Sequence, residues 1–303
     1  MNKVISILAI STVTLLAGTP ALSETQVVIL GTGTPVPDHT RAGAGVAIVY
    51  EGQAYIFDVG GGVVQRAIEA SSHLGIPALF PTNIQHVFIT HLHSDHMLDL
   101  VELVWTLWWR RTSQISVWGP AGLEFAAKGM YEMMNADITI RSSSSPGSSP
   151  VVNPGFYRII PTEIEEGTIF TNGNITIEAF TVPHGNISPA FGYRITTPDK
   201  VVVISGDTSY SEKLVEMAKG ADVLVHEVIS NEGVSELSED WQLYHSRSHT
   251  VTNELARVAT EARPDLLVLY HAIFYGAPVE TVLTEVQSLY DGEVVLANDL
   301  DVF

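Results

Sequence analysis

The fold and chemistry of this 303-residue chain are indicated first by residues 90–96, Thr90-His91-Leu92-His93-Ser94-Asp95-His96. The motif begins at the end of residues 86–90, His-Val-Phe-Ile-Thr, which we expect to form a buried strand. In an extended segment His91 and His93 project from the same side, so they can share one metal ion. Asp95 and His96 come where the chain turns into a helix, and they can reach a neighbouring ion. The stretch therefore predicts a centre for two metal ions.

Three isolated residues are candidates to complete this centre, because each follows a strand or strand-like run. They are His184 after Val182-Pro183, Asp207 after Ser205-Gly206, and His271 after Leu269-Tyr270. A lone histidine that ends a strand is more often a structural hydrogen-bond partner. The incomplete coordination at residues 91–96 favours metal binding instead. Gly206 would allow the close backbone approach that a carboxylate bridging two ions requires.

The amino-terminal residues have the features of an export signal. Lys3 precedes an apolar run at residues 4–17, and Ala21-Leu22-Ser23 resembles a signal-peptidase site. A membrane anchor is the alternative, but a run of roughly 14 apolar residues is shorter than the about 20 that span a bilayer. We expect a signal peptide at residues 1–23 and one domain at residues 24–303. Export and the absence of cysteine together indicate a periplasmic or secreted protein.

Composition restricts the class of substrate. Asp and Glu number 34 against 15 Lys and Arg, which gives a net charge of −19. Such a field repels polyanions, so we expect a small-molecule substrate and no nucleic acid. The alternative is that the acidic surface serves only solubility. Without cysteine, no thiolate can act as nucleophile or metal ligand.

The order of expected elements is typical of an α/β protein. Two sheets packed together with helices outside, a four-layer αββα sandwich, fit this order better than one doubly wound sheet. Residues 141–150, rich in Ser and Pro, should form a mobile loop, with a lid as an alternative role. We expect strands at residues 26–30, 45–50, 54–58, 86–90, 115–118, 168–170, 175–182, 190–196, 201–205, 223–226 and 266–270, and helices from the 58–62 turn to about 70 and at 97–111, 120–134, 212–219 and 251–261.

The His-x-His-x-Asp-His pattern at residues 91–96 resembles the signature of the metallo-β-lactamase superfamily, and the likeness extends from about Val27 to Tyr275. The resemblance implies the metallo-β-lactamase fold and two zinc ions, with manganese, iron or cobalt as alternatives. By this resemblance, His91, His93 and His184 bind the first ion, Asp95, His96 and His271 bind the second, and Asp207 bridges them. Asp58 matches an acid that holds a ligand histidine without binding metal itself, and a helix N-cap is its alternative role.

Residues 225–228, Val-His-Glu-Val, and residues 244–250, Tyr-His-Ser-Arg-Ser-His-Thr, resemble the ribonuclease Z and arylsulfatase-like branch. The resemblance implies that His249 lies beside the metals, is positioned by Glu227 and donates a proton to the leaving oxygen. A place ahead of the following helix is the alternative for His249. His245 and Arg247 are weaker candidates, because an exposed loop tip explains both, although Arg247 could bind a sulfate or phosphate. Ribonuclease Z carries a basic arm for transfer RNA, and this chain has only residues 196–200 at that place.

The activity implied is hydrolysis of small, preferably aryl, sulfate or phosphate esters by a metal-bridging hydroxide. Asp95, as a ligand, would also orient that hydroxide. Trp241 and Tyr244, near His249, could hold the aryl group, whereas Trp105, Trp108 and Trp109 fit a core or subunit contact better. Arg110 and Arg111 are expected at a solvated helix end.

Other readings of the same residues remain. A phosphodiesterase, or a lactonase or carboxylesterase, would use the same centre, and a periplasmic zinc-binding protein without turnover is the non-enzymatic alternative. A β-lactam hydrolase is less favoured, because those enzymes often use a cysteine ligand where this chain has Asp207. We expect no membrane association after signal cleavage. The resemblance also allows a homodimer.

Overall fold

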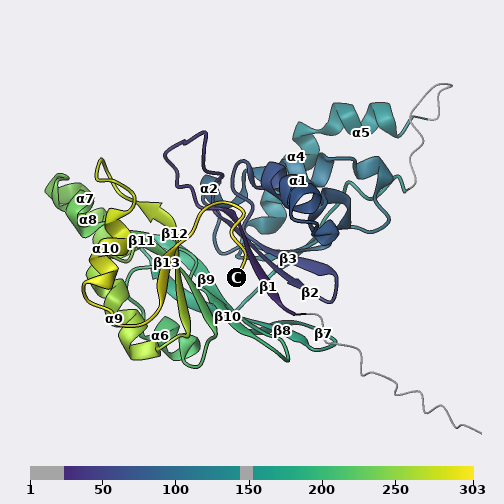
Figure 1. The fold of residues 1–303 in the computed structure, drawn as a ribbon. Coiled ribbons are helices and arrows are strands. Elements are labelled where there is room, and N and C mark those ends of the chain that lie inside the picture. The colour runs from purple at the N-terminus through teal and green to yellow at the C-terminus, as the bar shows by residue number, and fades with distance from the viewer. Residues whose placement is uncertain (1–23, 144–152) are drawn as a thin grey trace, which may run out of the picture.

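The computed structural model describes residues 24–143 and 153–303. The expected signal peptide and most of the expected 141–150 loop lie outside these residues. Two sheets pack face to face, and helices cover both outer faces (Figure 1). This arrangement confirms the predicted four-layer αββα sandwich. Within the described part of the chain, no helix has the length and apolar character needed to cross a membrane.

The first sheet has six strands in the order β1-β2-β3-β4-β5-β6, and α1, α3 and α4 cover its outer face, with α5 packed on α4. The strands are β1 (Gln26–Gly31), β2 (Gly45–Tyr50), β3 (Gln53–Phe57), β4 (His86–Phe88), β5 (Ser116–Gly119) and β6 (Ile160–Glu163). The helices are α1 (Val63–His73), α2 (Ser94–Met97), α3 (Asp99–Trp105), α4 (Leu123–Met133) and α5 (Asn135–Arg141), with 3-10 turns at Pro77–Leu79, Pro81–Asn83 and Trp108–Arg110.

The second sheet has seven strands in the order β13-β12-β11-β10-β9-β8-β7; α6, α9 and α10 cover its outer face, and α7 and α8 lie at one end of it. Its strands are β7 (Gly167–Asn172), β8 (Ile175–His184), β9 (Ile187–Thr196), β10 (Val201–Ile204), β11 (Val223–Ile229), β12 (Leu266–Ile273) and β13 (Val294–Leu296). The helices are α6 (Glu212–Ala218), α7 (Asn231–Ser235), α8 (Glu239–Ser248), α9 (Thr252–Ala262) and α10 (Thr281–Gln287).

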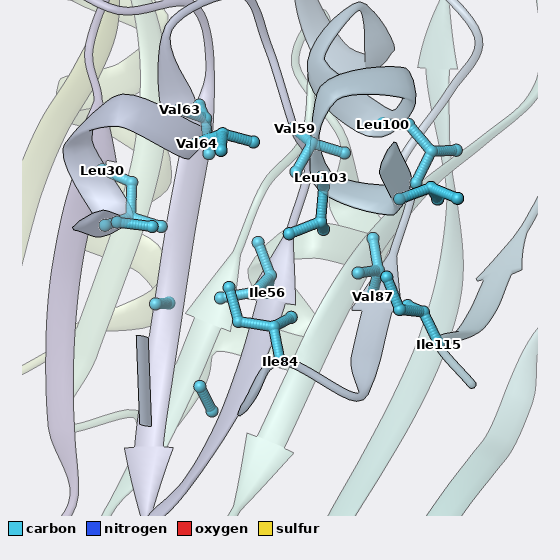
Figure 2. Packing of buried hydrophobic residues seen from close by; sticks show 14 of the residues in the cluster. Leu30, Ile56, Val59, Val63, Val64, Ile84, Val87, Leu100, Leu103 and Ile115 are labelled. Atoms are coloured by element: carbon cyan, nitrogen blue, oxygen red, sulfur yellow. The ribbon is translucent and has the colours of Figure 1, made fainter. Parts of the chain in front are cut away.

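Three apolar layers hold this sandwich together. One lies between the first sheet and its helices, where Ile56 and Val87 of the strands meet Leu100 and Leu103 of α3 (Figure 2). The middle layer joins the sheets, and there the Tyr193 hydroxyl of β9 donates a 2.7 Å hydrogen bond to the Ile89 carbonyl oxygen at the end of β4. The third lies under α6, α9 and α10. Burial of apolar surface in these layers is the main stabilising term, at about 25 cal/mol per Å².

The expected helix at residues 97–111 is wrong in its length. α3 ends at Trp105, Leu107 has φ of 53°, and a 3-10 turn follows. Arg111 is also not solvated: it is 1% exposed, and its guanidinium donates to the Leu103 and Ile84 carbonyl oxygens at 2.6 and 3.2 Å. Because α3 ends before Arg111, this side chain turns back to the two carbonyl oxygens instead of extending into solvent. Trp105 and Trp108 are buried in the first helical layer, which fits the core reading.

Candidate metal centre

The candidate ligands meet where strands of both sheets end. His91 and His93 lie just after β4, and Asp95 and His96 lie in the short α2. His184 ends β8, Asp207 follows β10, and His271 lies near the end of β12. Their ligand atoms form three groups, in each of which all atoms lie within 4.8 Å of one another: His91, His93 and His184; His91, His96 and Asp207; and Asp95, His96 and His271. The seven residues proposed from the sequence are therefore neighbours in space.

Irregular backbone places the ligands that come from the second sheet. In the β11–β12 pairing Glu227 is opposite Tyr270 and Val228 is opposite Ala272, so His271 is the extra residue of a β-bulge, with φ of 44°. The β8–β9 register also shifts between Val182 and His184. Gly206 has φ of 60°, and a Cβ there would lie 2.5 Å from the Phe191 carbonyl oxygen. Only glycine fits this position, and it brings Asp207 into the centre.

Hydrogen bonds fix the imidazole tautomers. The carbonyl oxygens of Ser248 and Gly33 accept from Nδ1 of His184 and His271, at 2.7 and 2.5 Å. A carbonyl oxygen can only accept, so these rings carry the proton on Nδ1 and turn an Nε2 lone pair to the centre. His96 follows the same pattern, because its Nδ1 lies 2.8 Å from Oδ2 of Asp58. An Nε2 lone pair directed inward is the form that a metal ion requires.

Asp58 is held behind His96 by Thr90. The Thr90 backbone nitrogen and hydroxyl donate to its two carboxylate oxygens at 2.7 and 2.8 Å. The N-cap of α1 is Gly62, so the alternative that Asp58 caps this helix is wrong. The carboxylate is instead a hydrogen-bond acceptor for His96.

Four inward-facing atoms at the centre are buried and have no hydrogen-bond partner among the residues that the structure describes: Oδ2 of Asp95, Nε2 of His96, Oδ1 of Asp207 and Nε2 of His271. His96 Nε2 lies 3.6 Å from Asp95 Oδ2 and 3.4 Å from Asp207 Oδ1. A tetrahedral site with metal–nitrogen distances of 2.0–2.1 Å places neighbouring ligand atoms about 3.3 Å apart. A buried polar atom without a partner costs free energy, and a bound cation would remove that cost. Imidazole nitrogens and carboxylate oxygens are ligands that suit divalent ions such as zinc.

The ionisable groups at the centre shift one another's pKa values. Burial alone would raise the pKa of Asp207, but His271 and His96 hold it well below its usual value. Burial would lower the pKa of His96, but Asp207 and Asp58 raise it well above the usual value. For His91, burial and the neighbouring His96 both lower the pKa. The residues therefore supply an ionised carboxylate and at least one neutral imidazole.

His249 and Glu227 lie together beside this cluster. His249 follows α8, and its Nδ1 lies 3.4 Å from Oε2 of Glu227 and 3.9 Å from Oδ2 of Asp207. The backbone nitrogen of Thr250 donates to Oε1 of Glu227 at 2.8 Å, which fixes the carboxylate. Burial would lower the pKa of His249, but Glu227 and Asp207 raise it above the usual value. His249 also lies two residues ahead of Val251, the N-cap of α9, so it has the place ahead of that helix which the alternative expected without being its cap.

A cavity of about 300 Å³ adjoins the centre. His93 and His184 form its inner end, and its walls come from α8 and from the turn between β8 and β9. Leu243, Tyr244 and Arg247 of α8 line it. Leu243 and Tyr244 are 52% and 44% exposed, so apolar surface is open to a ligand there.

Residues 55–272 match the family model described as the beta-lactamase superfamily domain. The chain belongs to the metallo-β-lactamase superfamily. Ribonuclease Z of Mycobacterium sp. (strain KMS) is 32% identical over 256 residues, which cover 84% of this chain and 86% of that protein. The superfamily expected from the resemblance at residues 91–96 is thereby confirmed, and the protein is a hydrolase of this superfamily with a cluster suited to metal ions.

Solved structures share the metallo-β-lactamase fold. The short form of human tRNase Z matches with a TM-score of 0.65 and 22% identity, covering 92% of this chain and 98% of that one. Zinc-bound PqqB from Methylobacterium extorquens matches with a TM-score of 0.67 and 16% identity, covering 92% of this chain and 99% of that one. These likenesses concern the fold.

Several residues of this metallo-β-lactamase site differ from the sequence expectations or were missed. His245 lies within α8 and is buried, so the exposed loop tip expected for it is wrong. Its Nε2 is hydrogen-bonded to the Tyr275 hydroxyl at 2.7 Å. Arg247 is exposed on the same helix rather than on a loop. The carbonyl oxygens of Gly33 and Ser248 were also missed, because a backbone acceptor has no signature in a sequence.

Proposed function

We propose that this protein hydrolyses small esters of sulfate or phosphate, preferably with an aromatic leaving group, at a centre for two divalent ions. The observation that carries this proposal is the His249–Glu227 pair: a buried imidazole next to the metal ligands, with its Nδ1 facing a carboxylate oxygen that has no hydrogen-bond partner among the described residues. A site that only stored zinc would gain nothing from an oriented proton donor.

The ligand assignment follows the groups of neighbouring atoms. His91, His93 and His184 would hold one ion, Asp95, His96 and His271 the other, and Asp207 lies between them within 3.9 Å of His91, His96, His184 and His271. Zinc suits this donor set, and manganese or iron are the alternatives. When bound, such ions supply Lewis acidity that activates water near neutral pH and polarises the ester.

His249 would act as the general acid. Its raised pKa favours the imidazolium form, and Glu227 holds that ring by its Nδ1 side. Protonation of the departing oxygen prevents an alkoxide or phenoxide from building up as the ester bond breaks. Asp95 would orient the attacking water from within the ligand set, while Asp207 stays ionised.

The cavity beside α8 supports an aromatic leaving group. Tyr244 lines it, and the Tyr244 and His249 ring centroids are 6.4 Å apart. Leu243 and Ile187 add apolar surface to the same cavity. An aryl group there would depart on the side of His249, where its oxygen can receive a proton.

Charge and the β9–β10 connection favour small substrates. The net charge of −19 repels polyanions. β9 and β10 are joined by residues 197–200 alone, which leaves no room for an extended arm at that turn. We also propose export to the periplasm or the exterior, from the composition of residues 1–23.

A phosphodiester is the second candidate substrate. Its support is the 32% identity to a ribonuclease Z, a name that denotes a nuclease. A small diester would use the same ions and the same proton donor, and the acidic surface would still disfavour long nucleic acid.

A panel of nitrophenyl substrates tests the proposal. The zinc-loaded protein and its chelated form are assayed with the sulfate, phosphate monoester, phosphodiester and carboxyl ester of nitrophenol, and with a lactone. We expect turnover of a sulfate or phosphate ester that chelation abolishes. Turnover only of the carboxyl ester or the lactone, or any turnover that survives complete metal removal, would contradict it.

A further inference from the structure

The residues after β13 join the two halves of the sandwich. They run back along the free edge of β1, where Val28 forms an antiparallel bridge with Val302. The Ile29 nitrogen donates to the Asp301 carbonyl oxygen, and the Leu300 nitrogen donates to the Ile29 carbonyl oxygen, at 2.9 and 2.6 Å. In Figure 1 the C-terminus accordingly lies beside β1. This pairing carries Asp299 to the turn that ends β1.

The Asp299 carboxylate accepts four hydrogen bonds in that turn. Its Oδ1 accepts from the Thr32 backbone nitrogen at 3.0 Å and from the Thr32 hydroxyl at 2.8 Å. Its Oδ2 accepts from the Ala42 nitrogen at 2.8 Å and from Nε of Arg66 at 2.9 Å. The side chain is 7% exposed. Four bonds from one nearly buried carboxylate fix both ends of the loop that contains residues 32–42.

Gly33 carries this restraint to the metal centre. Gly33 follows Thr32, and its nitrogen donates to the Ala42 carbonyl oxygen at 2.6 Å. Both Thr32 and Ala42 are hydrogen-bonded to Asp299. The carbonyl oxygen of Gly33 accepts the Nδ1 proton of His271 at 2.5 Å. The position of that oxygen therefore decides the tautomer and the direction of the His271 ring.

His271 depends on such an external restraint. It is the extra residue of the β-bulge and has φ of 44°, in the left-handed region that few residues other than glycine occupy. The ladder of β11 and β12 does not fix its ring. Within the described residues, the hydrogen bond to Gly33 is the contact that holds the Nδ1 side of the ring.

We propose that Asp299 is a positioning residue for the metal centre, which acts through Thr32 and the Gly33 carbonyl on His271. It sets the affinity for the ion held by Asp95, His96 and His271, and leaves the ion held by His91, His93 and His184 unaffected. This inference rests on the proposed two-ion centre. It assigns a role to a residue that lies outside the strand ends and outside the ligand motif.

The test uses Asp299→Asn, with Asp301→Asn as the matched control. Asp301 belongs to the same segment, and its carboxylate accepts only locally, from the Asn298 nitrogen at 2.7 Å and the Asn298 side-chain amide at 3.4 Å. Zinc and cobalt affinities are measured by competition with a chromophoric chelator. His93→Ala and His271→Ala, each lacking one ligand of one group, assign the two binding steps. Circular dichroism of the metal-free proteins checks folding.

For Asp299→Asn we expect the affinity assigned to the His271 ion to fall roughly 10- to 100-fold, the range for partners that orient a metal ligand. The other affinity and both affinities of Asp301→Asn should match the wild type. Thr32→Val, which removes one donor hydroxyl, carries the test if Asp299→Asn does not fold, with an expected loss of roughly three- to tenfold. Unchanged affinity for the His271 ion, or equal weakening of both ions, would overturn the inference.

The outcomes separate this inference from the proposed hydrolysis. Two ions bound with no ester turnover would overturn the proposed function and leave the role of Asp299 standing. A wild-type protein that binds fewer than two ions would overturn both. Ester turnover with unchanged ion affinity in Asp299→Asn would overturn the inference alone.

Discussion

The Nδ1 atom of His249 lies 3.4 Å from Oε2 of Glu227, and neither atom has a hydrogen-bond partner among the described residues. The other oxygen of Glu227 is anchored by the Thr250 nitrogen at 2.8 Å, so the carboxylate cannot turn away from the ring. This pair orients a histidine toward the candidate metal ligands, and it gives two of the predictions below.

Removal of the proton donor should matter most for poor leaving groups. His249→Ala is expected to lower kcat for unsubstituted phenyl esters by about 10²- to 10⁴-fold. Nitrophenyl esters should lose much less, because nitrophenolate departs without protonation. A series of phenols of graded pKa measures this as a steeper dependence of rate on leaving-group pKa. Equal losses across the series would rule out the general-acid role.

Glu227 should determine the alkaline limit of activity. Its carboxylate helps raise the pKa of His249. The imidazolium form of His249 is present below this pKa and is lost as pH rises through it. In Glu227→Gln the alkaline fall of kcat/KM for phenyl esters should therefore move to lower pH. The exposed Glu236→Gln serves as the control and should leave the profile unchanged. A shift to higher pH in Glu227→Gln would contradict this account.

His226 should make the protein less stable in mild acid. It is fully buried, and burial lowers its pKa to about 4, while an unfolded histidine has a pKa of about 6.5. The contribution of the neutral His226 to the free energy of unfolding is thus fully present above pH 6.5. Up to about 3 kcal/mol of it is lost as pH falls toward 4. Asparagine at this position retains a donor for the Glu227 carbonyl oxygen, which His226 Nδ1 contacts at 2.6 Å.

The measurement for His226 is urea unfolding of the metal-free wild type and His226→Asn between pH 4 and pH 8. The free energy of unfolding of the variant should fall less steeply below pH 6.5 than that of the wild type. The other histidines titrate in both proteins, so their contribution cancels in the difference. Parallel curves would show that His226 contributes nothing to acid sensitivity.

Metal removal should destabilise the protein as well as inactivate it. Nε2 of His271 and Oδ1 of Asp207 are buried without a hydrogen-bond partner in the described part of the chain, and a bound ion would give them one. A ligand that binds only the folded state raises stability by about 4 kcal/mol at a thousandfold excess over Kd. We expect chelation to lower Tm, and zinc, but not magnesium, to restore it. An unchanged Tm would argue against a metal centre.

Tyr244 should select aryl over alkyl esters. Tyr244→Ala is expected to raise KM for nitrophenyl esters roughly three- to tenfold and to leave KM for methyl esters unchanged. Trp241→Ala is the matched control, because Trp241 is an exposed aromatic residue of α8 that does not line the cavity. Similar effects of the two substitutions would place the aryl group elsewhere.

The sequence predicted those features that depend on local pattern. Apolar strands followed by His91, His184 or Asp207 are visible in the sequence as apolar runs that end at a polar residue. The sequence did not predict α8, because its mean hydropathy is low and its exposed face carries Trp241 and Tyr244. The bulge at His271 and the break after Trp105 depend on tertiary packing and leave no local signal. Arg111 looked like a surface residue for the same reason: its acceptors are the carbonyl oxygens of Leu103 in the preceding helix and of Ile84, 27 residues earlier, and a backbone acceptor leaves no sequence pattern.

The pairing of β1 with the residues after β13 has a consequence for biosynthesis. Thr32 is synthesised 267 residues before Asp299. At a translation rate of about 5–20 residues per second, the segment that covers the outer edge of β1 is synthesised on the order of tens of seconds after β1. During that interval the nascent chain presents an open strand edge of the kind that aggregates or recruits chaperones. Correct assembly of this sandwich should therefore depend on shielding of the polypeptide until the residues after β13 have paired with β1.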